Sequence, residues 1–467
     1  MKLERMHLLN FRCFDDLTIE FHEKLTVIVA ENGVGKTAVL DAVALGFGRY
    51  LSKLPGVKGQ GTKDSDLRVA KGERRERHLR MAWEARTREG EAMVWSGGRR
   101  RDGAVSFAEI RNLLANHAND AFRRDLKPMD ELALKLVEDD AEGRPYFLPV
   151  IAYYGTNRAI REEVQRRRGF RKTFSRFEAL EGALDPDSRF RAAFEWFNAM
   201  EDEERREQVA RKDFDYRLPA LQAVRTAIVR MLPSGVSNPR TETRPLRFVV
   251  DRVTNDGITR TLRVGQLSDG YRVVLGLVMD LARRMAQANS TLGPGGMEIA
   301  NPLDLPAIAL IDEVDLHLHP NWQQVVLGDL TRTFPETQFI VTTHSPQVLT
   351  SVDAACIRVL AYETDPETGA PRTVVRNVTQ QTMGVASSDL LAEIMGVNPI
   401  PDVEQARWVS DYHSLIQQNL HMQPEGMVLR RQLEEHFGMD HPVLRECDRL
   451  IRLQIYKARM PRTEGSR

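Results

Sequence analysis

Residues 30–37 read Ala-Glu-Asn-Gly-Val-Gly-Lys-Thr, a run whose glycines, lysine and hydroxyl group suit the binding of phosphate. The apolar residues before it, 25–29, predict a buried strand, and the mostly apolar residues after it, 38–45, predict a helix. In this context of strand, loop and helix, the run predicts a phosphate-binding loop rather than a purely structural turn. It departs from the usual pattern at its first position, where Ala30 replaces a glycine.

The polar and small residues of this loop have separate predicted roles. Gly33 and Gly35 let backbone N–H groups curl around phosphate oxygens, and the N-terminus of the following helix adds its positive dipole end. Lys36 would reach the β- and γ-phosphates of a nucleotide, and Thr37 would ligate Mg²⁺. Asn32, next to the first glycine, is counted with the nucleotide-binding residues.

Two carboxylates follow a second apolar stretch. Residues 307–311 read Ala-Ile-Ala-Leu-Ile and run directly into Asp312 and Glu313. Ligands gather at the carboxyl ends of strands in a parallel sheet, so both carboxylates are expected beside the phosphate loop. Asp312 is suited to hold Mg²⁺, directly or through water, and Glu313 to act as the general base that polarises the attacking water. The alternative, a surface acidic turn, is disfavoured by the apolar strand before it.

Two further elements are weak alone. Residues 267–271, Leu-Ser-Asp-Gly-Tyr, begin a predicted helix, where Ser268 could bind a phosphate oxygen and Gly270 permits close backbone approach. Taken alone, Ser268 is better explained as an ordinary helix N-cap. A strand predicted at 338–342 leads to His344, which could hydrogen-bond the γ-phosphate or the water, although a single histidine at a strand end is more often structural.

The order of these four parts resembles that of ABC-type ATPase heads. The N-terminal residues 8–14, Leu-Leu-Asn-Phe-Arg-Cys-Phe, look like the RecF and SMC branch of those heads. Within that branch, residues 312–320 and 343–346 are similar to the OLD-like group and to Septu and retron ATPases. Residues 267–272 and 153–156 resemble in particular the ATPase subunit, PtuA, of Septu antiphage systems, which is also found with some retrons.

The resemblance implies an α/β fold: an ABC-type P-loop ATPase head of mixed or parallel sheet with flanking helices, a helical insertion and a helical C-terminal extension. It also implies a homodimer through the ATPase heads, and possible higher oligomers. Each ATP would lie between Lys36 of one head and Ser268 and Gly270 of the other. ATP binding would then be coupled to closure of the dimer.

Three more residues acquire roles only through this resemblance. Asp315 would lie where the heads communicate across the dimer, and Arg12 matches a position that touches nucleotide in the RecF and SMC branch. Gln60 is the candidate for the glutamine that the family carries between the phosphate loop and the insertion. The implied activity is hydrolysis of ATP, with Mg²⁺ as cofactor, in a subunit that regulates a separate HNH-type nuclease, and DNA is a further candidate partner.

The pattern of strands and helices predicts four parts. Residues 1–104 would form the N-terminal lobe of the head, 105–240 a compact helical insertion, 241–380 the C-terminal lobe, and 381–467 a helical extension. Smaller predictions accompany these. Strands are expected at 78–83 and 91–95 with residues 99–101 at a hairpin tip, and a strand pair is expected at 246–250 and 259–264. A helix is expected at 322–331, and a hairpin carries Val359 and Val374 on its arms.

Composition narrows the class of protein. Lys and Arg together number 66, as do Asp and Glu, so any nucleic-acid contact would need a local patch. The basic run at 166–172 fits such a patch and equally fits a solvated helix face. Three cysteines, and no apolar run near the ~20 residues of a membrane span, predict a cytoplasmic protein without membrane contact.

Two interpretations of function stay open at this point. The chain between 345 and 467 lacks the Asp-x-Asp pair of the nuclease domain that OLD-like nucleases append, so no nuclease activity is expected in this chain. One interpretation is therefore an antiphage ATPase that controls a nuclease partner. The other is a RecF-like repair or loading ATPase that binds DNA when ATP is bound. His317 and His319 could suggest a metal site, but a place in the turn after Glu313 is the favoured interpretation.

Overall fold

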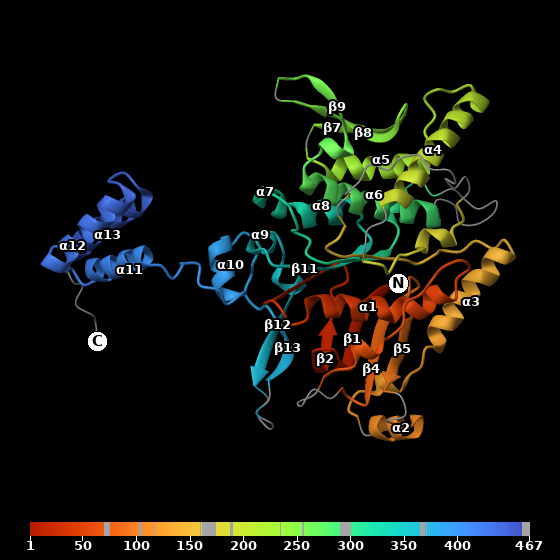
Figure 1. Ribbon diagram of the computed structural model, residues 1–467, viewed down its shortest axis with the longest axis horizontal. Coiled ribbons are helices and arrows are strands. Elements are labelled where there is room, and N and C mark those ends of the chain that lie inside the picture. Colours follow the sequence, from red (N-terminus) through yellow and green to blue (C-terminus); the bar gives the residue numbers. More distant parts are fainter. Residues whose placement is uncertain are drawn as a thin grey trace, which may run out of the picture. The chain divides into compact units, whose positions relative to one another are not determined.

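The computed structural model describes residues 1–69, 75–101, 105–115, 117–158, 160, 174–186, 190–233, 235–254, 256–289, 299, 301–364, 369 and 371–459. Two compact units, Met1–Leu390 and Leu391–Arg467, are distinguished (Figure 1). The second unit thus begins ten residues later than the predicted extension. The finer division into four parts remains a prediction.

A six-stranded sheet forms the centre of the first unit. Its order is β13-β12-β3-β11-β10-β6, and neighbouring strands are parallel except for the antiparallel pair β12 and β13. The strands are β3 (Leu25–Ala30), β6 (Val150–Tyr154), β10 (Ala307–Ile311), β11 (Thr337–Thr343), β12 (Ile357–Thr364) and β13 (Pro371–Asn377). Every residue of β6, β10 and β11 is buried, as expected for parallel strands covered on both faces. The α/β head predicted from the sequence is confirmed.

One side of this sheet is covered by α1 (Lys36–Ser52), which also packs on a second, antiparallel sheet of order β2-β1-β4-β5 (Figure 1). The strands of this second sheet are β1 (Lys2–Phe11), β2 (Phe14–Glu20), β4 (His78–Arg86) and β5 (Ala92–Arg100). Two tryptophans fix the helix to it, because the indole N–H of Trp83 donates to Ala42 O at 3.1 Å and that of Trp95 to Gly46 O at 2.8 Å. The helix that follows the phosphate loop is therefore held between two sheets.

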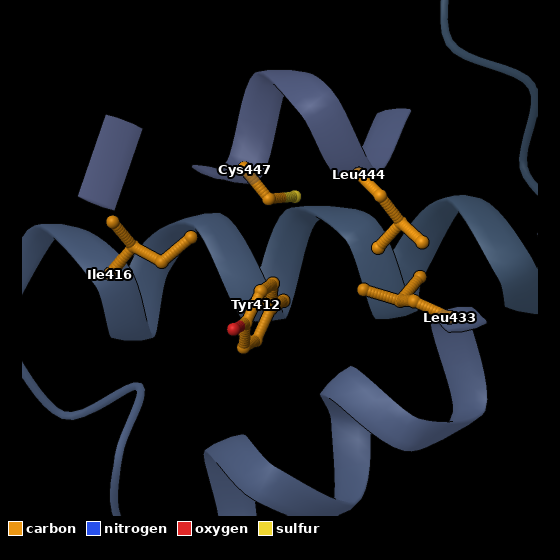
Figure 2. Close-up of a cluster of buried hydrophobic side chains, with 5 residues drawn as sticks. All are labelled: Tyr412, Ile416, Leu433, Leu444 and Cys447. Carbon is orange, nitrogen blue, oxygen red and sulfur yellow. The ribbon is translucent and has the colours of Figure 1, made fainter. Parts of the chain in front are cut away.

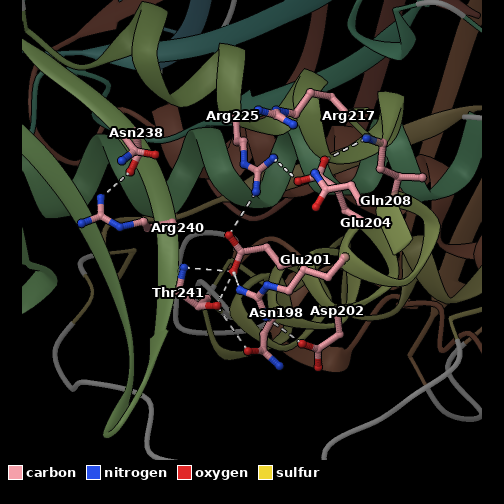
Figure 3. Close-up of polar contacts among 12 residues, drawn as sticks. Asn198, Glu201, Asp202, Glu204, Gln208, Arg217, Arg225, Asn238, Arg240 and Thr241 are labelled. Atoms are coloured by element: carbon pink, nitrogen blue, oxygen red, sulfur yellow. Dashed lines mark hydrogen bonds and ion pairs between the residues drawn. The ribbon is translucent and has the colours of Figure 1, made fainter. Parts of the chain in front are cut away.

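The other side carries α4 (Phe190–Arg211), α5 (Pro219–Met231), α6 (Asp269–Asn289) and α8 (Val326–Thr333), with a three-stranded sheet beyond them (Figure 1). That sheet consists of β7 (Val236–Thr243), β8 (Leu246–Val253) and β9 (Thr259–Arg263). Two buried carboxylates of α4, those of Glu201 and Glu204, have hydrogen-bond partners on α5 and β7 (Figure 3). Arg225 of α5 donates to Glu201 at 3.1 Å and to Glu204 at 2.7 Å, and the Thr241 N–H of β7 donates to Glu201 at 3.0 Å. Because these buried groups all have partners, we regard the cluster as structural.

Five further α-helices lie between Met1 and Glu393 in the described part of the chain, and the last of them spans the boundary between the two units. They are α2 (Phe107–Ala115), α3 (Lys127–Ala141), α7 (Pro320–Gln323), α9 (Pro346–Leu349) and α10 (Ser387–Glu393). The helix predicted at 322–331 is thus two helices, α7 and α8. No helix in the described part of the chain is both long and apolar enough to cross a bilayer.

The second unit contains α11 (Glu404–Gln417), α12 (Pro424–Phe437) and α13 (Pro442–Arg459). Five buried side chains from the three helices meet in its core: Tyr412, Ile416, Leu433, Leu444 and Cys447 (Figure 2). Its centre is an apolar cluster of the size expected for a small helical bundle.

Two details of the sequence prediction need correction. Residues 99 and 100 do not tip a hairpin, since Arg99 pairs with Leu79 inside β5. The two glycines before them were taken as a turn signal, but a Cβ on Gly98 would stand 2.5 Å from Leu79 O, so this glycine permits close strand approach. The apolar stretch that forms β6, within the predicted helical insertion, pairs with β10 in the main sheet. The run 166–172 lies outside the described residues.

Candidate active site

The phosphate loop connects β3 to α1 and has the backbone that its glycines allow. Gly33 and Gly35 adopt φ values of +83° and +114°, which residues with a side chain rarely adopt. A Cβ on Gly35 would stand 2.6 Å from Cys13 Sγ, so this position excludes any larger residue without movement of the loop. The loop leads directly into the N-terminus of α1, where the sequence predicts anion-binding N–H donors, and that role stays a prediction.

Lys36 lies inside this loop and is only 7% exposed. Its Nζ donates to the main-chain oxygens of Ala30 at 2.7 Å and Glu31 at 3.1 Å. Burial lowers the pKa of Lys36, and the charges of Asp312, Glu313 and Asp315 oppose that change. The ammonium group is therefore held by neutral carbonyls in a site that already contains nearby carboxylates.

The end of β10 meets the loop at Asp312. Its Oδ2 accepts a hydrogen bond of 2.9 Å from the Thr37 hydroxyl, and its Oδ1 accepts one of 2.6 Å from the Thr342 hydroxyl of β11. The main-chain N–H of Asp312 donates to Tyr154 O at 2.8 Å. The parallel sheet thus brings together a hydroxyl and a carboxylate that are far apart in the sequence, as the strand pattern predicted.

Residues 312–318 form what we call the acidic turn. Glu313 takes φ +48° and His317 takes φ +60°, left-handed conformations in residues other than glycine. The Glu313 N–H donates to the Thr342 hydroxyl at 2.8 Å, and its carbonyl accepts from the Leu316 N–H at 2.9 Å. The hydroxyl of Thr343 donates to Asp315 at 2.5 Å. Two consecutive threonines at the end of β11 therefore hold the turn from one side.

His344 follows these threonines, directly after β11. It is half-buried and precedes Ser345, whose hydroxyl accepts from the Gln347 N–H at 3.1 Å and so caps α9. The structure thus places His344 at the carboxyl edge of the sheet that also ends in Asp312. Its predicted contact with phosphate or water remains a prediction.

Ser268 and Gly270 begin α6. Ser268 is exposed and its carbonyl accepts from the Arg272 N–H at 3.0 Å, as expected for a residue at a helix start. A Cβ on Gly270 would stand 2.7 Å from His317 O. Gly270 therefore permits close approach of α6 to the acidic turn of its own chain. The predicted contact of Ser268 and Gly270 with a nucleotide on a second head remains a prediction.

Two residues singled out through family resemblance have other partners here. The Arg12 guanidinium bonds Asp41 and Asp66, the latter at 3.0 Å from Nε. The Gln60 side chain donates to Leu184 O at 2.7 Å. The Gln60 main chain packs on Gly48, about 18 Å along α1 from Lys36 at ~1.5 Å per residue. This position gives no support to a role for Gln60 at the phosphates.

Sequence reasoning missed Arg158, which is 1% exposed and follows β6. Its Nη1 donates to Gly155 O at 3.0 Å and Asp312 O at 2.5 Å, and its Nη2 donates to Glu313 O at 2.5 Å. An arginine in a loop carries no signal of burial, so the sequence could not have identified it. The buried hydroxyls of Thr342 and Thr343, in contrast, were visible as polar residues at the end of an apolar strand.

The two histidines lie in the acidic turn, at His317, and directly after it, at His319. His319 accepts the Asn321 N–H at 3.3 Å through Nδ1 and caps α7. Across the described residues, no group of three or more His, Cys, Asp or Glu side chains is arranged to hold a metal ion. The interpretation of His317 and His319 as turn residues is retained.

Comparison with known proteins shows which families this chain resembles. A family model described as "AAA domain" matches residues 5–222, and one described as "AAA domain, putative AbiEii toxin, Type IV TA system" matches residues 157–350. The "Retron Ec83 probable ATPase" of Escherichia coli is 25% identical over 98% of this chain and 88% of its own length. The "Retron Vc95 probable ATPase" of Vibrio cholerae is 24% identical over 89% and 84%.

A Septu relative extends the comparison. "Septu protein PtuA" of Bacillus thuringiensis is 29% identical over 28% of this chain and 32% of its own. The chain is similar to RecF/SMC-like ATPases of the retron and Septu type. Among solved structures, the SMC head domain from Thermotoga maritima aligns with 81% of this chain and 100% of its own chain, at 15% identity and a TM-score of 0.38. At that TM-score the alignment supports no comparison of individual residues.

Proposed function

We propose that this ATPase binds ATP with Mg²⁺ at the phosphate loop and hydrolyses it with Glu313 as general base. The observation that carries the proposal is the 2.9 Å hydrogen bond between Thr37 and Asp312, which joins the loop to the acidic turn. A hydroxyl and a carboxylate oxygen are the hard ligands that Mg²⁺ prefers. Since protein ligands are few here, phosphate oxygens and water would complete the coordination, as is usual for Mg²⁺. Bound Mg²⁺ would neutralise charge on the phosphates.

Binding of ATP and Mg²⁺ would change the hydrogen-bond partners of Lys36 and Thr37. Lys36 would exchange the carbonyls of Ala30 and Glu31 for anionic phosphate oxygens, which are stronger acceptors for an ammonium group. The Thr37 hydroxyl would turn from Asp312 toward the metal. Glu313 would orient and deprotonate the attacking water, and His344 would hydrogen-bond the γ-phosphate or that water.

We propose that two heads close around ATP, with Ser268 and Gly270 of a second copy facing the nucleotide. The exposure of Ser268 supports this, because its hydroxyl is accessible at the positive end of α6. Asp315 would lie at the contact between the heads. Closure would then depend on ATP, and hydrolysis would release it.

We further propose that the ATPase cycle regulates a separate nuclease, of HNH type, in an antiphage defence complex. The names of the retron and Septu relatives support a defence role, and their similarity extends over nearly the whole chain for the retron proteins. In this division of labour, the chain supplies ATP-dependent control and its partner cuts nucleic acid.

The test is an affinity purification of the tagged chain, expressed from its native locus, with ATP present and mass spectrometry of the eluate. We expect a stoichiometric small nuclease. The same purification with Lys36→Ala separates ATP-dependent partners from constitutive ones. Recovery of replication or recombination proteins, or of DNA alone, would instead favour the RecF-like function.

A second assay addresses the division of labour directly. The purified chain alone, with ATP and Mg²⁺, is expected to leave phage DNA intact. Degradation of DNA by the chain alone would contradict the proposal. A strong, salt-dependent affinity for DNA in the absence of any partner would favour the RecF-like alternative, because phosphate contacts weaken steeply as salt rises.

A further inference from the structure

The acidic turn contains a conformation that its own sequence does not favour. Glu313 has φ +48°, a value at which a side chain crowds the backbone. Such a residue persists only where the surroundings fix it, and these positions concentrate at functional sites. The contacts that hold the main chain of Glu313 therefore also determine the direction of its carboxylate.

Two side chains from outside the turn hold the main chain of Glu313. The Thr342 hydroxyl accepts from its N–H at 2.8 Å, and Arg158 donates to its carbonyl at 2.5 Å. Arg158 also donates to the carbonyl of Asp312 at 2.5 Å. One planar guanidinium group thus bridges two consecutive carbonyls, which fixes the orientation of the peptide between the two carboxylate residues.

The burial of Arg158 is costly, which argues against a role in packing alone. Among the described residues, its hydrogen bonds are all to main-chain carbonyls, and its buried Nε has no partner there. Burial lowers the pKa of Arg158 to about 10, against the attraction of Asp312, Asp315 and Glu313. An apolar residue of similar size would avoid this desolvation cost. The hydrogen bonds that the guanidinium donates to the acidic turn therefore offset part of its desolvation cost.

The main chain of Arg158 also lies against α6. A Cβ on Gly276 would stand 3.2 Å from Arg158 O, and Arg272 donates to Ile160 O at 3.4 Å. The first turn of the same helix touches the far end of the acidic turn, where Gly270 packs on His317 O. Helix α6 therefore contacts the His317 end of the acidic turn directly, and the Asp312–Glu313 end through Arg158.

We propose that Arg158 is a positioning residue for ATP hydrolysis. Its guanidinium holds the Asp312–Glu313 peptide so that the Glu313 carboxylate faces the attacking water, and it links the position of α6 to that carboxylate. Arg158 does not contact the nucleotide in this role. The proposal rests on the hydrolytic function proposed above.

The test compares Arg158→Met and Arg158→Lys with the wild-type chain for ATP affinity and for single-turnover hydrolysis. A catalytic group displaced by about 1 Å costs on the order of 100-fold in rate, so we expect Arg158→Met to lower the hydrolysis rate about 100-fold. ATP affinity should change by less than about threefold, because Lys36 and Thr37 are untouched. Arg158→Lys should recover little, since one ammonium group cannot bridge two carbonyls as the planar fork does.

A double-mutant cycle with Glu313→Gln separates positioning from general destabilisation. If Arg158 acts through Glu313, adding Arg158→Met to Glu313→Gln should leave the residual rate unchanged within about threefold. A further 100-fold loss in that background would overturn the proposal. A wild-type rate in Arg158→Met would also overturn it, and Arg158→Lys supplies the same cycle if the methionine variant does not fold.

Arg176→Met is the matched control. Arg176 also donates to main-chain carbonyls, those of Ala288 at 2.7 Å and Tyr146 at 2.9 Å, but it does not touch the acidic turn. Its replacement should lower the melting temperature and leave the hydrolysis rate unchanged. If the wild-type chain does not hydrolyse ATP, the proposed function fails. A different result separates the two proposals. If the wild-type chain hydrolyses ATP, Glu313→Gln does not, and Arg158→Met hydrolyses ATP at the wild-type rate, only the proposed role of Arg158 fails.

Discussion

The phosphate loop and the acidic turn both depend on left-handed backbone, but they obtain it by different means. In the loop the two positions are Gly33 and Gly35, whose conformation costs little. In the turn they are Glu313 and His317, and contacts from distant residues hold them. On the proposed function, nucleotide binding would be encoded in a short local run, whereas the geometry of hydrolysis would depend on tertiary packing. Changes in the loop should alter affinity, and changes in the turn should alter turnover.

The largest effect should come from Glu313→Gln in the acidic turn. Losing a general base typically costs 10²–10⁴-fold, so we expect kcat to fall about 1,000-fold with ATP affinity nearly unchanged. Size-exclusion chromatography with light scattering should show a dimer that persists in ATP. Near-normal turnover in this variant would mean that another group activates the water.

Lys36→Ala should produce the matching loss of binding in the loop. A hydrogen bond to a charged group contributes about 1.5–3 kcal/mol, so ATP affinity should fall on the order of 100-fold. Isothermal titration calorimetry measures this directly. Lys24→Ala is the control, because Lys24 is exposed and pairs with Glu336 away from the loop. Unchanged ATP affinity in Lys36→Ala would remove the phosphate-loop assignment.

Gly35→Ala and Gly33→Ala test the loop's local encoding. A Cβ on Gly35 would meet Cys13 Sγ at 2.6 Å, whereas one on Gly33 would meet nothing within 4 Å. Alanine at 33 adds only backbone strain, about 1 kcal/mol, while alanine at 35 also displaces the loop. We therefore expect about fivefold weaker ATP binding for Gly33→Ala and a clearly larger loss for Gly35→Ala. Equal losses would show that the contact with Cys13 is unimportant.

The smallest effect should be that of Gly270→Ala, which acts on the turn through α6. The added Cβ would stand 2.7 Å from His317 O, and overpacking of this kind costs about 1–3 kcal/mol. We expect a lower melting temperature and a several-fold lower kcat, with the ATP affinity of the single chain retained. Gly97→Ala is the control, because its Cβ would make only ordinary contacts, at 3.5 Å from Leu126. Loss of affinity without loss of turnover would contradict the comparison of loop and turn.

The same contrast explains what could be predicted from the sequence. Strands β3, β10 and β11 were predicted because each contains at least three consecutive apolar residues, and the phosphate loop was predicted because its residue types form a local pattern along the chain. Strand β7 was missed because Val236–Thr243 is mostly polar and buries only part of its length. Arg158 could not be found because its function lies in contacts with residues more than 150 positions away. Residues that act through a local pattern can be predicted from the sequence, whereas residues that act through contacts distant in the sequence cannot.

The order of the central sheet has a consequence for synthesis of the chain. Strand β3 has β11 and β12 as its neighbours. Leu25 can therefore pair only after Phe339, about 300 residues later in the chain, has been synthesised. At translation rates of about 5–20 residues per second, the apolar strand before the phosphate loop remains unpaired for roughly 15–60 seconds on the ribosome. During that interval the nascent chain carries a phosphate loop without its acidic turn. On the proposed function, ATP hydrolysis cannot begin before β10, the acidic turn and β11 have been made, which requires synthesis as far as Thr343.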